Sequence, residues 1–224
     1  MTSLALIPAR MGSQRLPKKN LRNLGGIPLI THAIRKAKTA GVFDEIWVNS
    51  DHPAFGEIAL AEGVQFHQRP EHLGGHHATS EEYILEFLEN HTCDYVFQVH
   101  SIAPLLTAEQ VQGFVRAMLQ SDKDVYLSAV LERIECMLGD IPLNFSFDSK
   151  TNSQELLPVQ RITWSITGWR RDTYLSAALS GGCATYSGKI GVYPIDRLAG
   201  LVIKTEEDLR LAEALFPLQA SCAN

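Results

Sequence analysis

Short apolar runs alternate with amphipathic segments over the first 132 residues. Apolar runs of strand length occupy residues 3–9, 45–50, 64–68, 94–100 and 124–132. Between them, apolar positions at helical spacing occupy residues 28–40, 53–63, 79–91 and 107–120. Regular alternation of strand and helix predicts a parallel sheet that is covered by helices on both faces and joined by right-handed crossovers. We therefore expect a three-layer α/β fold with a mostly parallel sheet.

The helix starts carry capping signals. Thr79 or Ser80 is placed to cap the third helix, whose first turn is acidic. Thr107 precedes Gln110 by three residues, which is the spacing of a capping box. These signals support the predicted positions of the two helices.

The alternation lapses after residue 132. Residues 144–158 are polar and turn-rich. Further strands are predicted at 161–169 and 189–195, and helices at 171–179 and 205–216. We therefore predict a single domain over residues 1–224, with an excursion from the core sheet at about residues 133–187.

The composition narrows the class of protein. The chain has 224 residues, of which 45% are hydrophobic and 20% charged, as in ordinary soluble domains. A net charge of −5 without a Lys/Arg run disfavours binding to nucleic acid or to an anionic membrane. There is no signal peptide pattern and no apolar run of the roughly 20 residues that span a membrane. The dispersed cysteines, predicted to be reduced thiols of a cytoplasmic protein, are Cys93, Cys136, Cys183 and Cys222.

A basic segment that contains a glycine follows the first predicted strand. Its notable residues are Arg10, Gly12, Ser13, Arg15, Lys18 and Lys19. Open α/β sheets bind ligands at the carboxyl ends of their strands. Glycine lets the backbone approach a ligand, and arginine and lysine neutralise phosphate. The position therefore favours a phosphate-binding loop over a solvated basic loop, although the Walker A spacing is absent.

The sequence ARMGSQRLPKKN of this segment, followed by L-x-x-L-x-G-x-P-L-I, resembles the opening signature of the sugar-acid cytidylyltransferases. The acylneuraminate cytidylyltransferase (CMP-sialic acid synthetase) family is the closest, and ketodeoxyoctonate and spore-coat-type cytidylyltransferases share the motif more loosely. The resemblance continues in residues 43–51, 62–73, 79–80, 104–108 and 205–213. It implies a fold of the nucleotide-diphospho-sugar transferase type.

The resemblance also implies roles for individual residues. In that family an arginine and a lysine of the signature hold the triphosphate, which implies catalytic roles for Arg10 and Lys19. The nucleotide-binding positions that it implies are Ala9, Arg10, Gly12, Ser13, Lys19, Asn20, Arg69 and Ser80. From the residues alone, Arg69 could equally be a loop arginine and Ser80 a helix N-cap.

The activity implied by the resemblance is transfer of CMP from CTP to a sugar acid, similar to sialic acid, with release of pyrophosphate. The excursion pairs two chains in such proteins, which implies a homodimer. Two alternatives stay open: cytidylyl transfer to another acidic acceptor such as a phosphonate, and a catalytically silent nucleotide-binding subunit.

The sequence departs from the family at the metal site. The family motif D-I-D-T-x-x-D-L, whose first two aspartates hold Mg²⁺, becomes VIKTEEDL at residues 202–209, with Lys204 in place of one aspartate. Asp208 matches the later aspartate and suits the first turn of a helix. We expect Mg²⁺ as cofactor, but its ligands are unknown. Three explanations stay open. In the first, Lys204 supplies positive charge in place of the metal, and in the second, Mg²⁺ arrives bound to CTP and Asp51 or water completes its coordination. In the third, the protein binds a nucleotide without transferring it.

The acceptor motifs also differ from those of the family, at residues 100–106 and 164–168. His100 ends a strand and is a candidate acceptor contact or general base, or else a structural histidine. Ser50 and Asp51 could contact ribose or cap the next helix. Trp164 and Trp169 are expected to pack, within the chain or at a subunit interface.

One further cluster has a weak metal signal. It consists of His72, His76, His77 and Glu81. Because its spacing fits no standard zinc pattern, polar surface is the favoured interpretation.

Overall fold

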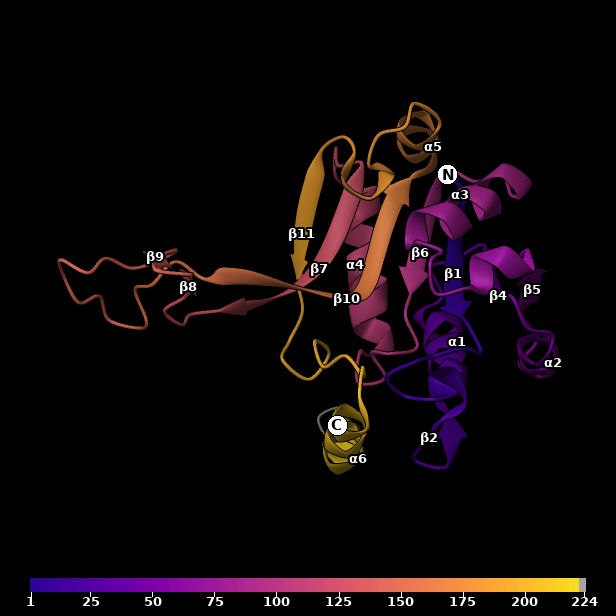
Figure 1. Cartoon of the computed structure of the whole chain (residues 1–224), viewed down its shortest axis with the longest axis horizontal. Coiled ribbons are helices and arrows are strands. Elements are labelled where there is room, and N and C mark those ends of the chain that lie inside the picture. The colour runs from indigo at the N-terminus through magenta and orange to yellow at the C-terminus, as the bar shows by residue number, and fades with distance from the viewer. Residues whose placement is uncertain (222–224) are drawn as a thin grey trace.

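The computed structural model describes residues 1–221, and a seven-stranded sheet forms its centre (Figure 1). In spatial order the strands are β11 (Ile190–Pro194), β7 (Val125–Glu132), β10 (Val159–Arg170), β6 (Tyr95–Val99), β1 (Ser3–Ala9), β4 (Glu45–Ser50) and β5 (Gln65–Gln68). Only β10 runs antiparallel to its neighbours β6 and β7, and the other pairs are parallel. The predicted three-layer, mostly parallel α/β fold is therefore confirmed.

Helices cover both faces of the sheet because its strands are apolar on both sides. The helices on one face are α1 (Leu29–Ala40), α2 (Ala54–Ala61) and α4 (Ala108–Leu119). Those on the other are α3 (Ser80–Asn90) and α5 (Arg171–Leu179). In β1, Ala5 and Ile7 belong to the first core, whereas Leu4 and Leu6 belong to the second. This alternation follows from the two-residue period of a strand.

The helix starts are capped as the sequence predicts. The Thr79 side chain accepts a hydrogen bond from the amide of Glu82, whose carboxylate accepts from the Thr79 amide, and this capping box begins α3. Thr107 and Gln110 form the same box at α4. Both boxes satisfy amides that have no partner inside the helix.

Smaller elements surround the carboxyl end of β1. They are η1 (Lys19–Leu21), η2 (Glu71–Gly74) and the hairpin of β2 (Asn23–Leu24) with β3 (Ile27–Pro28), whereas η3 (Ala184–Tyr186) packs against α5 in the second core. A third core of Leu16, Leu24, Leu29, Ile203 and Leu209 joins this region to α6 (Glu206–Ser221). The loop after β1 is therefore anchored by α6 at the end where ligands are expected.

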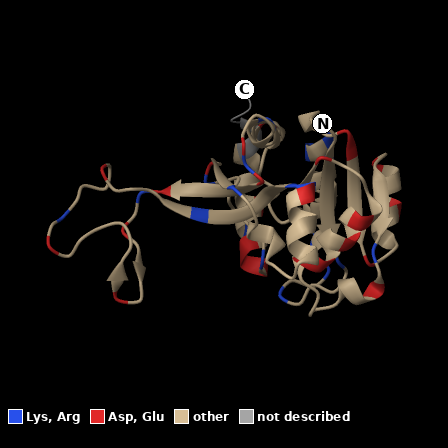
Figure 2. Ribbon diagram, turned by 90° about the horizontal axis from the view of Figure 1, so that it is seen from above, with Lys and Arg blue, Asp and Glu red and all other residues tan. Residues whose placement is uncertain are grey.

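An arm of residues 133–158 leaves the body between β7 and β10 (Figures 1 and 2). It contains one hairpin, of β8 (Met137–Leu138) with β9 (Ile141–Pro142). The predicted excursion of 133–187 is too long at its C-terminal end. Trp169 and Tyr174 are large apolar side chains that bury in the second core, so β10 and α5 return to the body.

Trp164 lies where β10 turns toward the arm. Its φ is +58°, and the register of β10 against β7 shifts between Ile162 and Thr167. Its ring packs edge-on against Tyr186, with centroids 6.2 Å apart. Trp164 therefore packs within the chain, at the bulge that bends the strand.

The described residues contain no helix that is both long enough and apolar enough to cross a membrane. Cys93, Cys136 and Cys183 are free thiols, and Cys222 lies outside the described residues.

Candidate functional site

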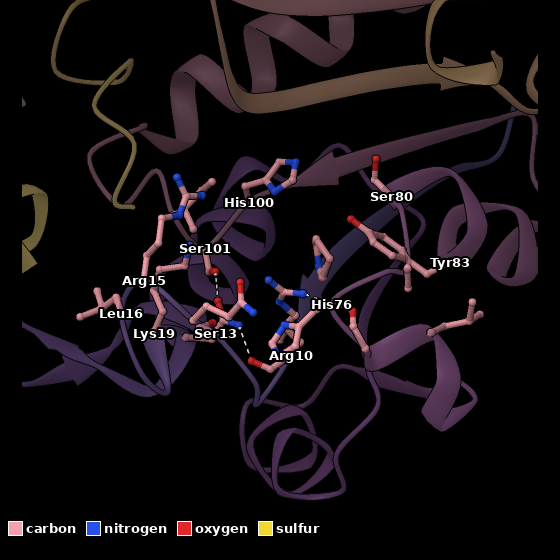
Figure 3. A pocket seen from close by; sticks show the side chains of 18 of the residues that line it. Arg10, Ser13, Arg15, Leu16, Lys19, His76, Ser80, Tyr83, His100 and Ser101 are labelled. Atoms are coloured by element: carbon pink, nitrogen blue, oxygen red, sulfur yellow. Dashed lines mark hydrogen bonds between the residues drawn. The ribbon is translucent and has the colours of Figure 1, made fainter. Parts of the chain in front are cut away.

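A cavity of about 560 Å³ opens at the carboxyl ends of β1 and β6 (Figure 3). The predicted site residues that line it are Ala9, Arg10, Ser13, Lys19, Asn20, Arg69, Ser80 and His100. Figure 3 shows Arg15 and Lys19 at one side of the opening and Ser80 and Tyr83 at the other. Gly12 is not part of the lining, but it lies close to His76. A Cβ added to Gly12 would lie 3.8 Å from His76 Cε1.

Asn20 ties the basic loop to the loop after β6. Its side chain is buried, with Nδ2 donating to the Arg10 carbonyl at 3.1 Å and Oδ1 accepting from Ser101 Oγ at 2.7 Å. Arg10 Nη1 in turn donates to the Gly75 carbonyl at 3.3 Å. In this arrangement Asn20 fixes the backbone from which the Arg10 side chain projects into the cavity.

Arg69 is a buried cation, which excludes the interpretation as an ordinary loop arginine. It is 3% exposed, and its guanidinium lies 4.6 Å from the centroid of the Tyr83 ring. Its Nη2 donates to the Ala9 carbonyl and lies 3.8 Å from Asp51 Oδ1. Burial lowers the pKa of Arg69, and Asp51 and Tyr83 oppose that shift. The result is a fixed positive charge in the wall of the cavity.

Ser80 is free of the capping role that the sequence left open. Thr79 is the N-cap, and Ser80 is the first residue of α3 and lines the cavity. The neighbouring Ser50 is fully buried, and its Oγ accepts from the amide of His52 at 3.2 Å. Ser50 and Asp51 do not belong to the lining of the cavity: Ser50 supports the turn before α2, and Asp51 pairs with Arg69.

Lys19 carries the clearest electrostatic signature of the site. Partial burial and the nearby charges of Arg15, Arg10 and Lys204 lower its pKa to about 8. An ammonium group is destabilised in this way where positive charges converge without enough negative charge among them. The excess of positive charge therefore suits the site to binding an anion.

The cationic side chains of the lining are Arg10, Arg15, Lys19, Arg69 and Lys204, and no aspartate or glutamate belongs to it within residues 1–221. Lys18 is exposed and is not part of the lining, so the basic segment divides into lining and surface residues. Arg15 and Lys204 are not among the nucleotide-binding positions that the resemblance implies, although the sequence places Arg15 in the basic segment and offers Lys204 as one replacement for the metal charge.

His100 is held in its neutral form. Burial and the charge of Lys19 lower the pKa of His100 to about 4. Its backbone amide donates to the Ser165 carbonyl at 3.2 Å, while its buried Nε2 has no hydrogen-bond partner. A neutral imidazole on the cavity wall can offer one nitrogen to a ligand, but its low pKa makes it a weak base at pH 7.

The residues present do not fit a magnesium ion held by the protein. Asp208 accepts from the Lys204 and Thr205 amides, both at 2.8 Å, and so caps α6, as its sequence position suggests. Residues 1–221 contain no group of three His, Cys, Asp or Glu side chains with metal-binding geometry. In the histidine cluster, Glu81 instead accepts from the Thr185 amide at 2.6 Å.

These features define a class of protein first. A mostly parallel sheet with a cationic cavity at its carboxyl ends is typical of α/β proteins that bind phosphorylated ligands. One solved structure, a CMP:2-keto-3-deoxy-manno-octonic acid synthetase in complex with CTP, has the same fold. The TM-score is 0.76 at 19% identity, over 98% of this chain and 100% of that chain.

The family follows from the sequence comparisons. The model of the cytidylyltransferase family matches residues 4–215, and the chain belongs to this family. N-acylneuraminate cytidylyltransferase A of Danio rerio is 33% identical over 127 residues, 56% of this chain and 30% of that protein. Pseudaminic acid cytidylyltransferase of Campylobacter jejuni is 31% identical over 135 residues, 58% of each chain. The chain thus spans 30% of the length of the first relative and 58% of the second.

Proposed function

We propose that this protein transfers CMP from CTP to a sugar acid and releases pyrophosphate. The observation that carries the proposal is the cationic cavity at the carboxyl end of β1, in a chain of the cytidylyltransferase family. The names of the relatives, which act on acylneuraminate and pseudaminic acids, support a sugar acid as acceptor. The alternatives are another acidic acceptor, such as a phosphonate, and a silent nucleotide-binding subunit.

In the proposed reaction an acceptor oxygen attacks the α-phosphorus of CTP. The bond to the bridging oxygen breaks, that oxygen leaves on pyrophosphate, and the acceptor proton goes to solvent. Arg10 and Lys19 would bind the triphosphate and stabilise the charge that grows on the leaving group. Neutral His100 would contact the acceptor from the wall of the cavity. No covalent enzyme intermediate is needed, because positioning and charge stabilisation supply the catalysis.

Pyrophosphate release with CTP and a panel of acids tests this function. A sialic-acid-like sugar acid should support release, and a phosphonate should not. Release with the phosphonate alone would replace the acceptor class. CTP binding without release for every acid would support the silent subunit.

Variants of the basic loop test the nucleotide site. Removing a charge-assisted contact costs about 1.5–3 kcal/mol, so Arg10→Ala or Lys19→Ala should weaken CTP binding at least about tenfold. Calorimetry that gives unchanged affinity for both variants would refute the placement of the triphosphate.

We also propose a cytoplasmic homodimer in which the arm of one chain packs on a second copy. The arm has no core of its own and exposes apolar side chains: Leu138 (70%), Ile141 (67%), Phe147 (68%) and Leu157 (76%). A two-stranded hairpin with exposed apolar residues is marginally stable by itself, and a second arm would cover these residues. The free thiols Cys93, Cys136 and Cys183 suit a reducing compartment.

Light scattering tests the homodimer. Wild type should be a dimer at micromolar concentration, and Leu138→Glu should shift it toward monomer. Leu60→Glu is the matched control, because Leu60 is an exposed leucine of α2 outside the arm. A monomeric wild type would refute the dimer.

A further inference from the structure

Two carboxylates near the cavity, those of Asp51 and Asp208, are bonded to other groups of the protein. Asp51 pairs with Arg69, and Gly74 packs so closely on it that an added Cβ would lie 2.4 Å from Asp51 Cγ. The Asp208 carboxylate accepts from two backbone amides and from Thr205 Oγ1, which lies 2.9 Å away. Both side chains are therefore held in place by protein groups, and neither belongs to the cavity lining.

The positive charges, in contrast, have few counterions. Among the lining cations Arg69 has Asp51 as its partner at 3.8 Å. The others are Arg10, Arg15, Lys19 and Lys204, for which the described residues give no salt bridge. The fully ionised triphosphate of a nucleotide carries about four negative charges, since each phosphate contributes one and the terminal one a second near neutral pH. Four cations therefore match a triphosphate without any metal ion.

Lys204 contributes to this excess of positive charge. It lies just before α6, at the edge of the cavity, with an exposed side chain that is free to reach a ligand. Its charge is one of the causes that lower the pKa of Lys19, so the two ammonium groups act on each other across the site. A divalent cation in the cavity would be repelled by Lys204 and would find no carboxylate in the described lining, since Asp208 is bonded to the Lys204 and Thr205 amides.

We propose that this site binds the metal-free nucleoside triphosphate, with Lys204 supplying positive charge in place of a divalent cation held by protein carboxylates. This inference rests on the proposed function, because it assumes that the anion in the cavity is a nucleotide. The Lys204 ammonium would offset the negative charge that remains on the polyphosphate after Arg10, Arg15 and Lys19 have bound. Magnesium complexed to the triphosphate would cancel about two of its charges and weaken these contacts.

Calorimetry of CTP binding in EDTA and in excess MgCl2 tests the inference without an activity readout. Wild type should bind at least as tightly in EDTA as in MgCl2. In EDTA, Lys204→Met should weaken binding at least about tenfold, as expected for a lost charge-assisted contact. Lys18→Met is the matched control, since it removes an equal charge from an exposed lysine of the loop after β1 that is outside the lining, and it should change affinity less than about threefold.

Lys204→Asp provides the reverse test. It brings a carboxylate to the cavity, so binding by this variant should require MgCl2. The inference is overturned if wild type binds CTP only with MgCl2, or if Lys204→Met binds as well as Lys18→Met. Those outcomes leave the proposed function intact. Absence of CTP binding by wild type in both buffers would overturn the proposed function and the inference together.

Discussion

The lowered pKa of Lys19 leads to a pH dependence of nucleotide binding. In the proposed function the ammonium of Lys19 binds phosphate, whereas the neutral amine would not. In the free protein the pKa of Lys19 is about 8, because of burial and then the charges of Arg15, Arg10 and Lys204. A bound triphosphate adds negative charge and raises that pKa, so binding takes up a proton at pH above 8. Affinity should therefore fall as the pH rises through 8.

The magnitude follows from the protonated fraction. A group with a pKa of about 8 is roughly nine-tenths protonated at pH 7 and roughly one-tenth protonated at pH 9, so CTP affinity should fall about tenfold. An unperturbed lysine would lose only a few per cent of its charge over this range, since its pKa is about 10.4. The terminal phosphate, whose second pKa is about 6, is already ionised throughout.

Calorimetry at pH 7, 8 and 9 measures this fall, and buffers with different ionisation enthalpies measure the proton uptake. Lys19→Arg is the control, because arginine stays charged over the whole range, and its affinity should be nearly constant. Lys204→Met should move the inflection of the Lys19 curve to higher pH, since it removes one cause of the lowered pKa. An equal fall in wild type and Lys19→Arg would refute the reasoning.

Three substitutions test the packing around the site through urea unfolding. Burial lowers the pKa of Lys36 to about 7 in the folded protein. Above pH 7 the unfolded chain therefore binds more protons than the folded one, and the free energy of unfolding of wild type should rise by about 2 kcal/mol between pH 7 and 9. Lys36→Met should not show this rise. Gly168→Ala should cost about 1–3 kcal/mol, because the added Cβ would lie 2.5 Å from Met118 Sδ. Thr79→Ala should cost about 1 kcal/mol through loss of the α3 capping box, and Thr79→Ser should restore most of it. Equal stability of each variant and wild type under these conditions would contradict the corresponding argument.

The periodic part of the fold was predictable from the sequence because each element there makes its own local signal. Residues 3–9 and 45–50 match β1 and β4 in both bounds. The direction of β10 was not predictable, because an apolar run has the same pattern in either orientation. The C-terminal end of the arm was not predictable for a related reason. Residues 159–170 form one strand that is exposed near the arm and buried in the body, and the apolar pattern alone does not show where the arm ends.

The candidate site was predictable where chemistry depends on residue type and position in the loop. Arg10 follows β1 directly, so its place at the cavity needed only the strand assignment, whereas Lys19 lies ten residues after the end of β1, at the start of η1, and was assigned through the signature. Tyr83 carried no signal, because a tyrosine within a helix most often belongs to the core, and its contact with Arg69 joins two elements. Burial of Lys36, whose Nζ donates to the Ala103 carbonyl at 2.7 Å, likewise arises only from tertiary packing.

If Lys204 replaces a metal ion as proposed, the metal requirement of the site changes without disturbing the fold. The backbone around it is fixed by Asp208, which caps α6, and by the third core through Ile203 and Leu209. The Lys204 side chain itself is exposed and takes no part in that core. Exchange of an acidic for a basic side chain at such a position costs little in packing, yet it reverses the charge presented to the polyphosphate. Asp208 preserves the backbone geometry, and under the proposal Lys204 adds to the charge of Arg10, Arg15 and Lys19 that repels a cation at this edge of the cavity.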